Sequence, residues 1–223
     1  IVNFGDTTDM DEREDLVETY ARSMGGDIIS YDHYGFHYST YNRMEEIRRV
    51  ALAYEMPYWR YLKAYVDAGT TDTWPEESDL RWDAFKGMLY GFTGHTWFLY
   101  QAEPAHGLDS VLFSDTGEWS SGQSSTFSSV ASINQELEVL GRSISLLTST
   151  DVRYIPATSL YTPEGTTDWS AGAGGDPYLS SVESIDSSSW EYQDVSLGFF
   201  EDDAGEIYVM VQNPTHAGSD WPI

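Results

Sequence analysis

The sequence predicts an α/β fold in which strands and helices alternate through residues 1–155, followed by a β-rich region. Three observations carry this prediction. Four strand-like runs each precede a helix-like run, every unit is long enough for a helical crossover, and helical periodicity stops after Pro156. Consecutive units of this kind form parallel sheets with helical connections. An open doubly wound sheet and one half of a closed (β/α)8 barrel both fit the pattern.

The four strand–helix units follow one another directly. The predicted strands cover residues 1–4, 28–34, 57–66 and 95–100, and the predicted helices cover 9–24, 40–54, 80–89 and 127–147. Apolar side chains recur at steps of three and four in these helices, most clearly in the last one. Asp9 with Glu12 resembles a capping box, and glycines at 25 and 26 end the first helix. The strands are apolar and aromatic on both faces, as a buried parallel sheet requires.

Three common catalytic and binding motifs are missing from the sequence. No G-x-G-x-x-G motif or P-loop follows any of the strands, which counts against a dinucleotide-binding sheet. No G-x-S-x-G motif occurs either, and the serine clusters lie in predicted loops. Nucleotide-dependent and serine-hydrolase chemistry are therefore not expected.

The last third of the chain differs in amino-acid composition and in hydrophobic pattern. Serine, glycine, aspartate and threonine dominate residues 166–189, and one strong β-hairpin follows, formed by 195–200 and 206–211 around a turn at 201–205. We therefore expect two domains. Residues 1–155 form the alternating part, and residues 156–223 form the opening of an antiparallel β domain.

The charge balance is strongly acidic. The chain has 37 acidic and 11 basic residues and a net charge of −26. Such a surface repels phosphate backbones and anionic membranes, so nucleic-acid and lipid partners are not expected. Adaptation to high salt and an ordinary acidic secreted protein both explain the charge. The spread of the acids along the chain and the presence of only two lysines, Lys63 and Lys86, favour the halophilic explanation.

The sequence also lacks cysteines, membrane-spanning segments and metal-binding motifs. The chain contains no cysteine, which excludes disulfides and thiolate sites. No apolar run is long enough for membrane insertion. His33 and His37 are four residues apart, but they lie on a strand-to-loop segment without a third ligand or an H-E-x-x-H motif. No metal or other cofactor is expected.

Six segments resemble, in order and spacing, parts of a known enzyme family: Asp27–Tyr34, Met56–Trp59, Leu80–Trp82, Leu89–Phe98, Ser132–Gly141 and Leu197–Asn213. They are similar to the last four βα units of large bacterial glycoside hydrolases of the two-carboxylate (β/α)8 type, including β-galactosidase-like members, and to the β domain that follows them. The resemblance implies the C-terminal half of a TIM barrel, with residues 1–4 as strand five and 95–100 as strand eight. The partner that completes it is then the N-terminal half of the same polypeptide.

In (β/α)8 enzymes the chemistry lies at the C-terminal ends of the strands, which selects the candidate site residues. Asp32, at the end of strand six, and Glu103, after strand eight, are the catalytic candidates; a structural carboxylate and a solvated loop acid are the alternatives. The substrate-binding candidates are His33, Tyr34, Trp59, Lys63, Trp97 and Tyr100. The two tryptophans can stack on sugar rings or pack the barrel, and Lys63 can bind a hydroxyl or form an ion pair across the mouth.

The resemblance implies a glycoside hydrolase that acts on extracellular polysaccharide or oligosaccharide, located outside the cell or at its surface. The family places its two glutamates at the ends of strands four and seven. Strand four precedes Ile1, and strand seven ends in Tyr61-Leu62-Lys63-Ala64-Tyr65, which contains no glutamate. A non-catalytic carbohydrate-binding or cell-surface module with a degenerate barrel is therefore the alternative. A small self-contained α/β domain is a third possibility.

Overall fold

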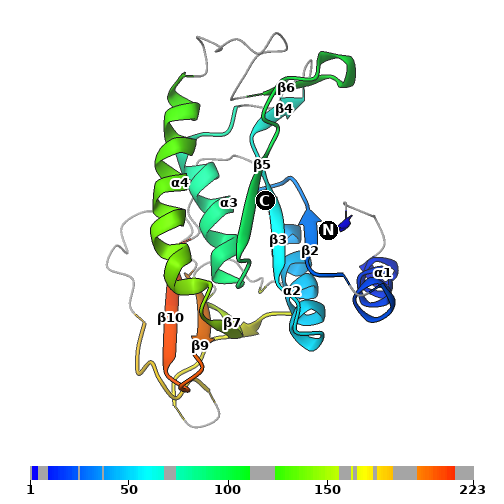
Figure 1. The fold of residues 1–223 in the computed structure, drawn as a ribbon. Coiled ribbons are helices and arrows are strands. Elements are labelled where there is room, and N and C mark those ends of the chain that lie inside the picture. The colour runs from blue at the N-terminus through cyan, green and yellow to red at the C-terminus, as the bar shows by residue number, and fades with distance from the viewer. Residues whose placement is uncertain are drawn as a thin grey trace.

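The computed structural model describes residues 2–4, 10–24, 26–36, 38–67, 74–110, 124–155, 162, 165–172, 175–182 and 195–213. Strands and helices alternate as far as α4, which confirms the predicted α/β class (Figure 1). The predicted cap at Asp9 and the glycine at position 25 lie outside the described residues.

The first sheet has four parallel strands in chain order: β1 (Val2–Phe4), β2 (Ile29–Asp32), β3 (Tyr58–Lys63) and β5 (Gly94–Phe98). Helices α1 (Met10–Ser23), α2 (Tyr38–Ala53) and α3 (Glu77–Leu89) connect successive strands, and α4 (Ser124–Ile144) follows β5 in the chain. Every crossover therefore leads to the neighbouring strand, and the described strands form an open sheet.

One face of the first sheet is covered by these helices. Ile29 and Tyr31 of β2 and Tyr58 of β3 form one core with side chains from α1, α2 and α3. Leu62 of β3 belongs to a second core with α3 and α4. Because side chains alternate along a strand, the residues between these positions point to the other face, which we call the open face.

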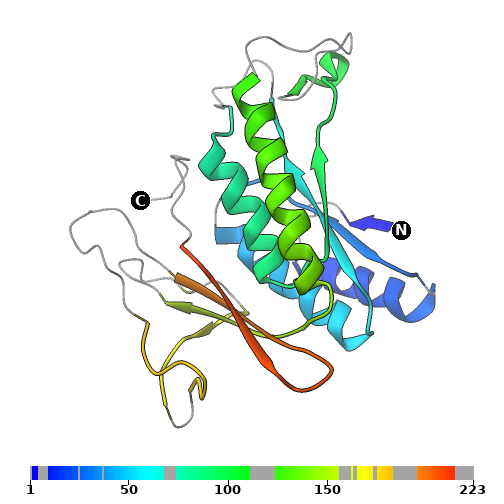
Figure 2. The same ribbon diagram turned by 60° about the vertical axis from the view of Figure 1, so that its left-hand side comes forward.

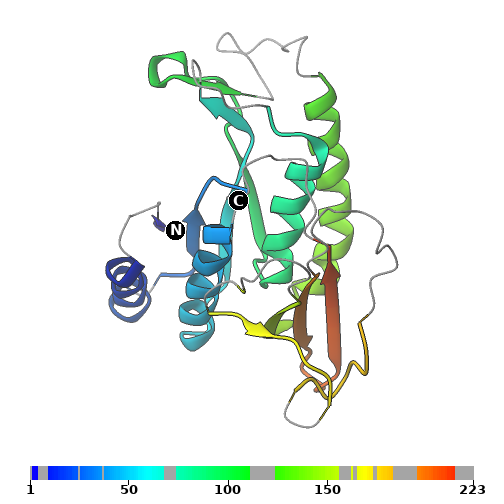
Figure 3. The ribbon, with the colours of Figure 1, turned by 180° about the vertical axis from the view of Figure 1, so that it is seen from behind.

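The strand predicted over 57–66 is divided in the structure. β3 ends at Lys63, and β4 (Tyr65–Asp67) pairs instead with β6 (Leu108–Ser110) in a two-stranded antiparallel ribbon. The backbone amide of Ala64, between the two strands, donates to the carbonyl of Phe98 at the end of β5. The ribbon projects beyond the C-terminal ends of the first sheet (Figure 1, Figure 3).

A second sheet has the order β10-β9-β7-β8, with β7 (Thr148–Ile155), β8 (Thr167–Asp168), β9 (Val195–Glu201) and β10 (Ile207–Gln212). The β9–β10 pair is the hairpin that the sequence predicts, and β7 also runs antiparallel to β9. β7, which precedes the boundary predicted at residue 155, pairs with β8 and β9 of this sheet. The predicted last helix ends at Ile144 rather than at residue 147.

Helix α3 lies between the two sheets, with α4 beside it (Figure 2). Nζ of Lys86, on α3, donates to Oγ of Ser196 on β9 at 2.8 Å, and the Gln212 side chain donates to the carbonyl of Trp82 at 3.2 Å. On α2, Nε of Arg48 donates to Oγ of Ser149 at 2.8 Å. The second sheet is thus joined to the helical layer by buried polar contacts as well as by apolar packing.

Candidate functional site

The open face carries a mixture of aromatic and polar side chains. Following the strand registers, it presents Ser30 and Asp32 from β2, Trp59, Tyr61 and Lys63 from β3, and Thr96 and Phe98 from β5. Most of them are partly exposed, and neither of the two helix-packed cores contains any of them. In this part of the chain the open face is therefore less fully buried than the helix-covered face.

Five of these and neighbouring residues gather at the C-terminal ends of the strands. We call Asp32, Tyr34, Lys63, Tyr65 and Phe98 the strand-end cluster. The Tyr34 ring stacks on Phe98 at 5.3 Å between centroids, and Tyr65 meets both rings edge-on at 5.3 and 5.7 Å. The three rings form an aromatic wall at the C-terminal edge of a parallel sheet, where active sites concentrate.

Asp32 and Tyr34 form the acidic part of this cluster. Burial and then the negative charge of Asp32 raise the pKa of the Tyr34 phenol far above its ordinary value near 10, and a hydrogen bond to Asp32 contributes. Tyr34 therefore stays protonated at neutral and mildly alkaline pH and donates to the carboxylate. Such a donor fixes the orientation of Asp32.

Lys63 forms the basic part of the cluster. Its Nζ lies 5.3 Å from the centroid of the Tyr65 ring and 5.9 Å from that of Phe36, within the range of a cation–π contact. The backbone amide of Lys63 donates to Oδ2 of Asp83 on α3 at 3.2 Å. Asp83 in turn pairs with the buried guanidinium of Arg60, 2.5 Å away. Helix α3 thus holds the end of β3 in place.

Two predicted substrate-binding residues lie on the other side of the sheet. Trp97 pairs in register with Leu62, on the helix-covered face, and its Nε1 donates to Oδ1 of Asn134 on α4 at 2.7 Å. His33 is buried, and the Arg43 guanidinium on α2 donates to its Nδ1 at 2.9 Å. This corrects their predicted placement at the mouth beside Asp32, because both side chains alternate toward the helices.

Three further candidates lie apart from the strand-end cluster. Trp59 is on the open face, but near the start of β3, where its ring packs on Gly94 so closely that a β-carbon there would stand 2.4 Å from the indole. Tyr100 follows β5 and is 64% exposed. Oε2 of Glu103, in the segment that leads to β6, lies 2.9 Å from Nδ1 of His106. The structure does not bring Glu103 together with Asp32 in any contact of the described residues.

Phe98 is the member of the cluster that the sequence does not indicate. It occupies the end of a predicted strand, but only its register opposite Lys63 shows that it faces the open side. Tyr65 lies near the end of the strand predicted over 57–66, but the sequence does not indicate its place on the ribbon. The sequence feature that could have indicated this cluster is the high density of aromatic residues around three predicted strand ends.

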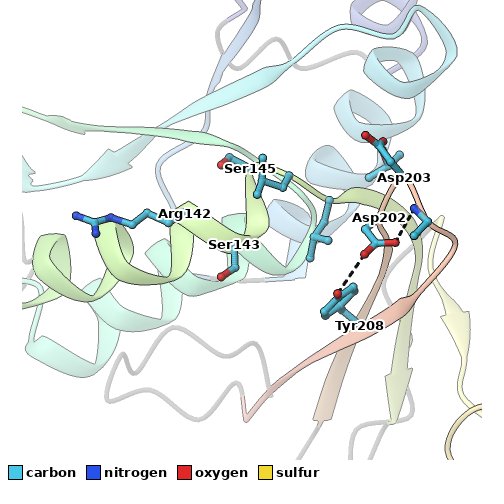
Figure 4. A pocket seen from close by; sticks show the side chains of 10 residues that line it. Arg142, Ser143, Ser145, Asp202, Asp203 and Tyr208 are labelled. Atoms are coloured by element: carbon cyan, nitrogen blue, oxygen red, sulfur yellow. Dashed lines mark hydrogen bonds between the residues drawn. The ribbon is translucent and has the colours of Figure 1, made fainter.

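Two of the hollows that the described residues line lie away from the strand-end cluster. The larger, of about 760 Å³, lies between the end of α4, the start of β7 and the β9–β10 turn (Figure 4). Its Asp202 carboxylate accepts hydrogen bonds from the amides of Ala204 and Glu206 and from the Tyr208 hydroxyl. These bonds fix the hairpin turn. The smaller, of about 420 Å³, lies between α3 and β10.

Within the described ranges, no group of three or more histidine, aspartate or glutamate side chains is arranged to hold a metal ion. In the same ranges no helix combines the length and the apolar character that crossing a membrane requires.

Comparison with protein families, with curated proteins and with solved structures finds no match to this chain. The strand order, the open face and the strand-end cluster are therefore the features of this chain that bear on its function.

Proposed function

We propose that this chain is the C-terminal half of a (β/α)8 barrel that acts as a glycoside hydrolase, with Asp32 as one of its catalytic carboxylates. The supporting observation is the position of Asp32. It lies beside an aromatic wall at the C-terminal edge of a parallel sheet whose strands are paired in chain order.

The strand order supports the barrel part of this proposal. Right-handed crossovers between successive neighbouring strands place all helices on one face, and the cores of this chain place α1, α2 and α3 there. A doubly wound sheet would instead reverse its strand order and carry helices on both faces. Consecutive order with one covered face is the arrangement from which a barrel closes.

The second half of the barrel is the partner that this proposal requires. Among the described strands, nothing pairs with the outer edges of β1 and β5. Unpaired edges and a partly exposed aromatic face are costly. Four further strands, supplied by the same polypeptide, would pair with both edges and turn the open face into a barrel interior.

The chemistry proposed for this mouth is carboxylate catalysis. Glycoside hydrolysis uses two carboxyl groups across the scissile bond, with a separation of roughly 5 Å for retention and more for inversion. Asp32 supplies one, oriented by Tyr34. The second comes from the completing half, and the rings of Tyr65 and Phe98 offer surfaces on which sugar rings can stack.

The test is hydrolysis by the full polypeptide that contains this chain. Release of reducing ends is measured on a panel of polysaccharides. The Asp32→Asn variant should lose about 10²- to 10⁴-fold in rate while still binding oligosaccharide. Asp15→Asn, at an exposed position on α1, is the matched control. Full activity in Asp32→Asn rules out its catalytic role.

A second candidate function is a non-catalytic carbohydrate-binding module. The observation that favours it is Lys63, which occupies the end of β3 where the resembled family has a glutamate. Oligosaccharide binding without hydrolysis of any substrate, together with Asp32→Asn behaving like the unaltered protein, would select this alternative.

A further inference from the structure

The hollow between the end of α4 and the β9–β10 turn, which we call the hairpin hollow, has a volume of about 760 Å³. We propose that it is a second carbohydrate-binding site, which takes part of a neutral sugar chain with Tyr208 as the stacking surface. The ligand class rests on the proposed function, but no residue of the strand-end cluster takes part. The two sites can therefore be tested separately.

The hairpin hollow lies far from the strand-end cluster. Residues between Arg142 and Thr148 line one side, and Asp202, Asp203, Ala204 and Tyr208 line the other (Figure 4). The 21 residues of α4 lead from the C-terminal side of the first sheet back to the second sheet (Figure 1), a distance of roughly 30 Å along the helix. A short oligosaccharide in the hollow therefore leaves the strand-end cluster unoccupied.

Tyr208 supplies an aromatic ring whose orientation is fixed at both ends. Its backbone pairs with Phe200 in the β9–β10 ladder, and its hydroxyl donates to Oδ2 of Asp202 at 3.2 Å. The residue is nevertheless 46% exposed. Sugar rings pack their C–H faces on such aromatic surfaces, and a ring that is already held in place loses little conformational entropy on binding.

Asp202 holds this side of the hollow together. Its Oδ1 accepts hydrogen bonds from the backbone amides of Ala204 at 2.9 Å and of Glu206 at 3.0 Å. The bonds from the Glu206 and Ala204 amides hold the pKa of the carboxyl group below its usual range. The neighbouring Asp203 is exposed, and its carboxylate can accept hydrogen bonds from sugar hydroxyls.

The opposite side of the hollow combines apolar and hydroxyl groups. Leu146 is 74% exposed, and Ser143 and Ser145 lie close to it in the chain and also line the hollow. The Arg142 guanidinium donates to Oε1 of Glu138 at 2.7 Å and points away from the hairpin (Figure 4). Sugars present both C–H faces and hydroxyl edges, so this mixture of an exposed leucine, an exposed tyrosine and polar groups matches their chemistry.

The charge around the hollow selects against anionic ligands. Asp202 and Asp203 lie on one side, and the C-terminal end of α4, on the other, carries the negative end of the helix dipole. The whole chain has a net charge of −26, which repels uronic, sulfated and phosphorylated sugars. A neutral sugar meets no such repulsion. Its affinity should be equal at about 0.1 M and about 1 M salt, because no screened attraction contributes.

The experiment is isothermal titration of the full polypeptide carrying Asp32→Asn, which prevents turnover. The probes are neutral oligosaccharides of galactose, glucose, mannose or xylose, each of equal length and at both salt concentrations. We expect two binding sites for one class of sugar. Adding Tyr208→Ala should weaken one of them about tenfold or more, whereas Tyr208→Phe, which keeps the ring, should retain most of the binding. Tyr65→Ala should weaken the other site.

A variant on the helix side tests the hollow without altering the hairpin turn. Leu146→Ser removes the exposed leucine and should weaken the same site as Tyr208→Ala. In the polypeptide with Asp32 restored, both variants should slow the hydrolysis of polysaccharide and leave that of short oligosaccharides unchanged. The reason is that a second site raises the effective concentration of a long chain at the mouth.

Tyr178→Ala is the matched control. Tyr178 is 58% exposed, and its ring lies 6.5 Å from that of Phe199. Phe199 precedes Phe200, the partner of Tyr208, and therefore faces the other side of the second sheet. The control should bind sugar like the unaltered protein. Circular dichroism checks that each variant folds.

A single site that Tyr65→Ala weakens and Tyr208→Ala leaves unchanged overturns the inference and leaves the proposed function intact. A single site that is lost with Tyr208→Ala supports the inference and counts against the strand-end cluster. Binding of charged sugars only, or binding that falls at about 1 M salt, overturns the assignment of a neutral ligand. Binding of no sugar by the folded polypeptide overturns both proposals.

Discussion

Gly87 of α3 lies against His95 of β5 so closely that a β-carbon on Gly87 would stand 2.6 Å from Nε2 of the imidazole and 3.1 Å from Cδ of Arg60. This approach lets α3 bring Asp83 to the guanidinium of Arg60. We predict that Gly87→Ala destabilises the protein by about 1–3 kcal/mol through overpacking, although alanine is the better helix former. Urea unfolding followed by circular dichroism measures the change.

Gly141 provides the matched control for that substitution. It also lies in a helix, α4, but a β-carbon there meets nothing within 4 Å. Gly141→Ala should therefore stabilise the protein by roughly 0.5–1 kcal/mol, the helix-propensity gain. If both glycines respond alike, the close contact of α3 with β5 is not the cause.

His95 should make the fold sensitive to mild acid. Burial, followed by the charge of Arg60, lowers its pKa from 6.5 to about 3. In the unfolded chain His95 is protonated below about pH 6.5, whereas in the folded protein it stays neutral down to about pH 3. Its contribution to the free energy of unfolding is therefore fully present above pH 6.5 and is lost as the pH falls toward 3. Between pH 7 and pH 5 we expect a loss on the order of 2 kcal/mol from this residue.

The comparison that isolates His95 is urea unfolding of the unaltered protein and of His95→Gln at both pH values. The variant cannot titrate at this position, so its free energy of unfolding should fall less between pH 7 and pH 5. The same pH dependence in both proteins would contradict the prediction.

Trp97 should contribute to stability rather than to sugar binding. Trp97→Phe removes the hydrogen bond from Nε1 to Asn134 and should cost about 1 kcal/mol of unfolding free energy. Its affinity for oligosaccharides should stay unchanged, because the ring faces α4. Tyr65→Ala, on the open side, should weaken binding instead. Titration of both variants with the same sugar shows whether Trp97 faces α4 or contacts the sugar.

Tyr34 should report directly on the charge of Asp32. Asp32→Asn removes the carboxylate that helps to raise the pKa of the phenol, so this pKa should fall, while burial keeps it above the ordinary value. A carbon-13 NMR titration of labelled tyrosine, with Tyr34→Phe to assign the signal, measures the shift. An unchanged Tyr34 signal would show that the two groups do not interact.

The predicted order of strands and helices agrees closely with the structure, because this information is local. The period-3.6 stripe of α4 and the two β-rich runs around Glu201–Gly205 can be read within short windows, and both correspond to elements of the structure. The missed strand β7 also alternates locally, through Val152 and Tyr154. Its partner β9, however, lies about 45 residues away, beyond the reach of any local pattern.

By itself the sequence determined the α/β class, the acidic character, the absence of thiol chemistry and the choice of three strand ends as the candidate site. The tertiary structure alone decided which of those side chains face one another. Asp32 and His33 are adjacent in the chain yet lie on opposite faces, and Trp97 turns to α4 while Phe98 joins Tyr34. The physical reason is that side chains alternate along a strand, so only the pairing register and the packed helices determine which residues reach the open face.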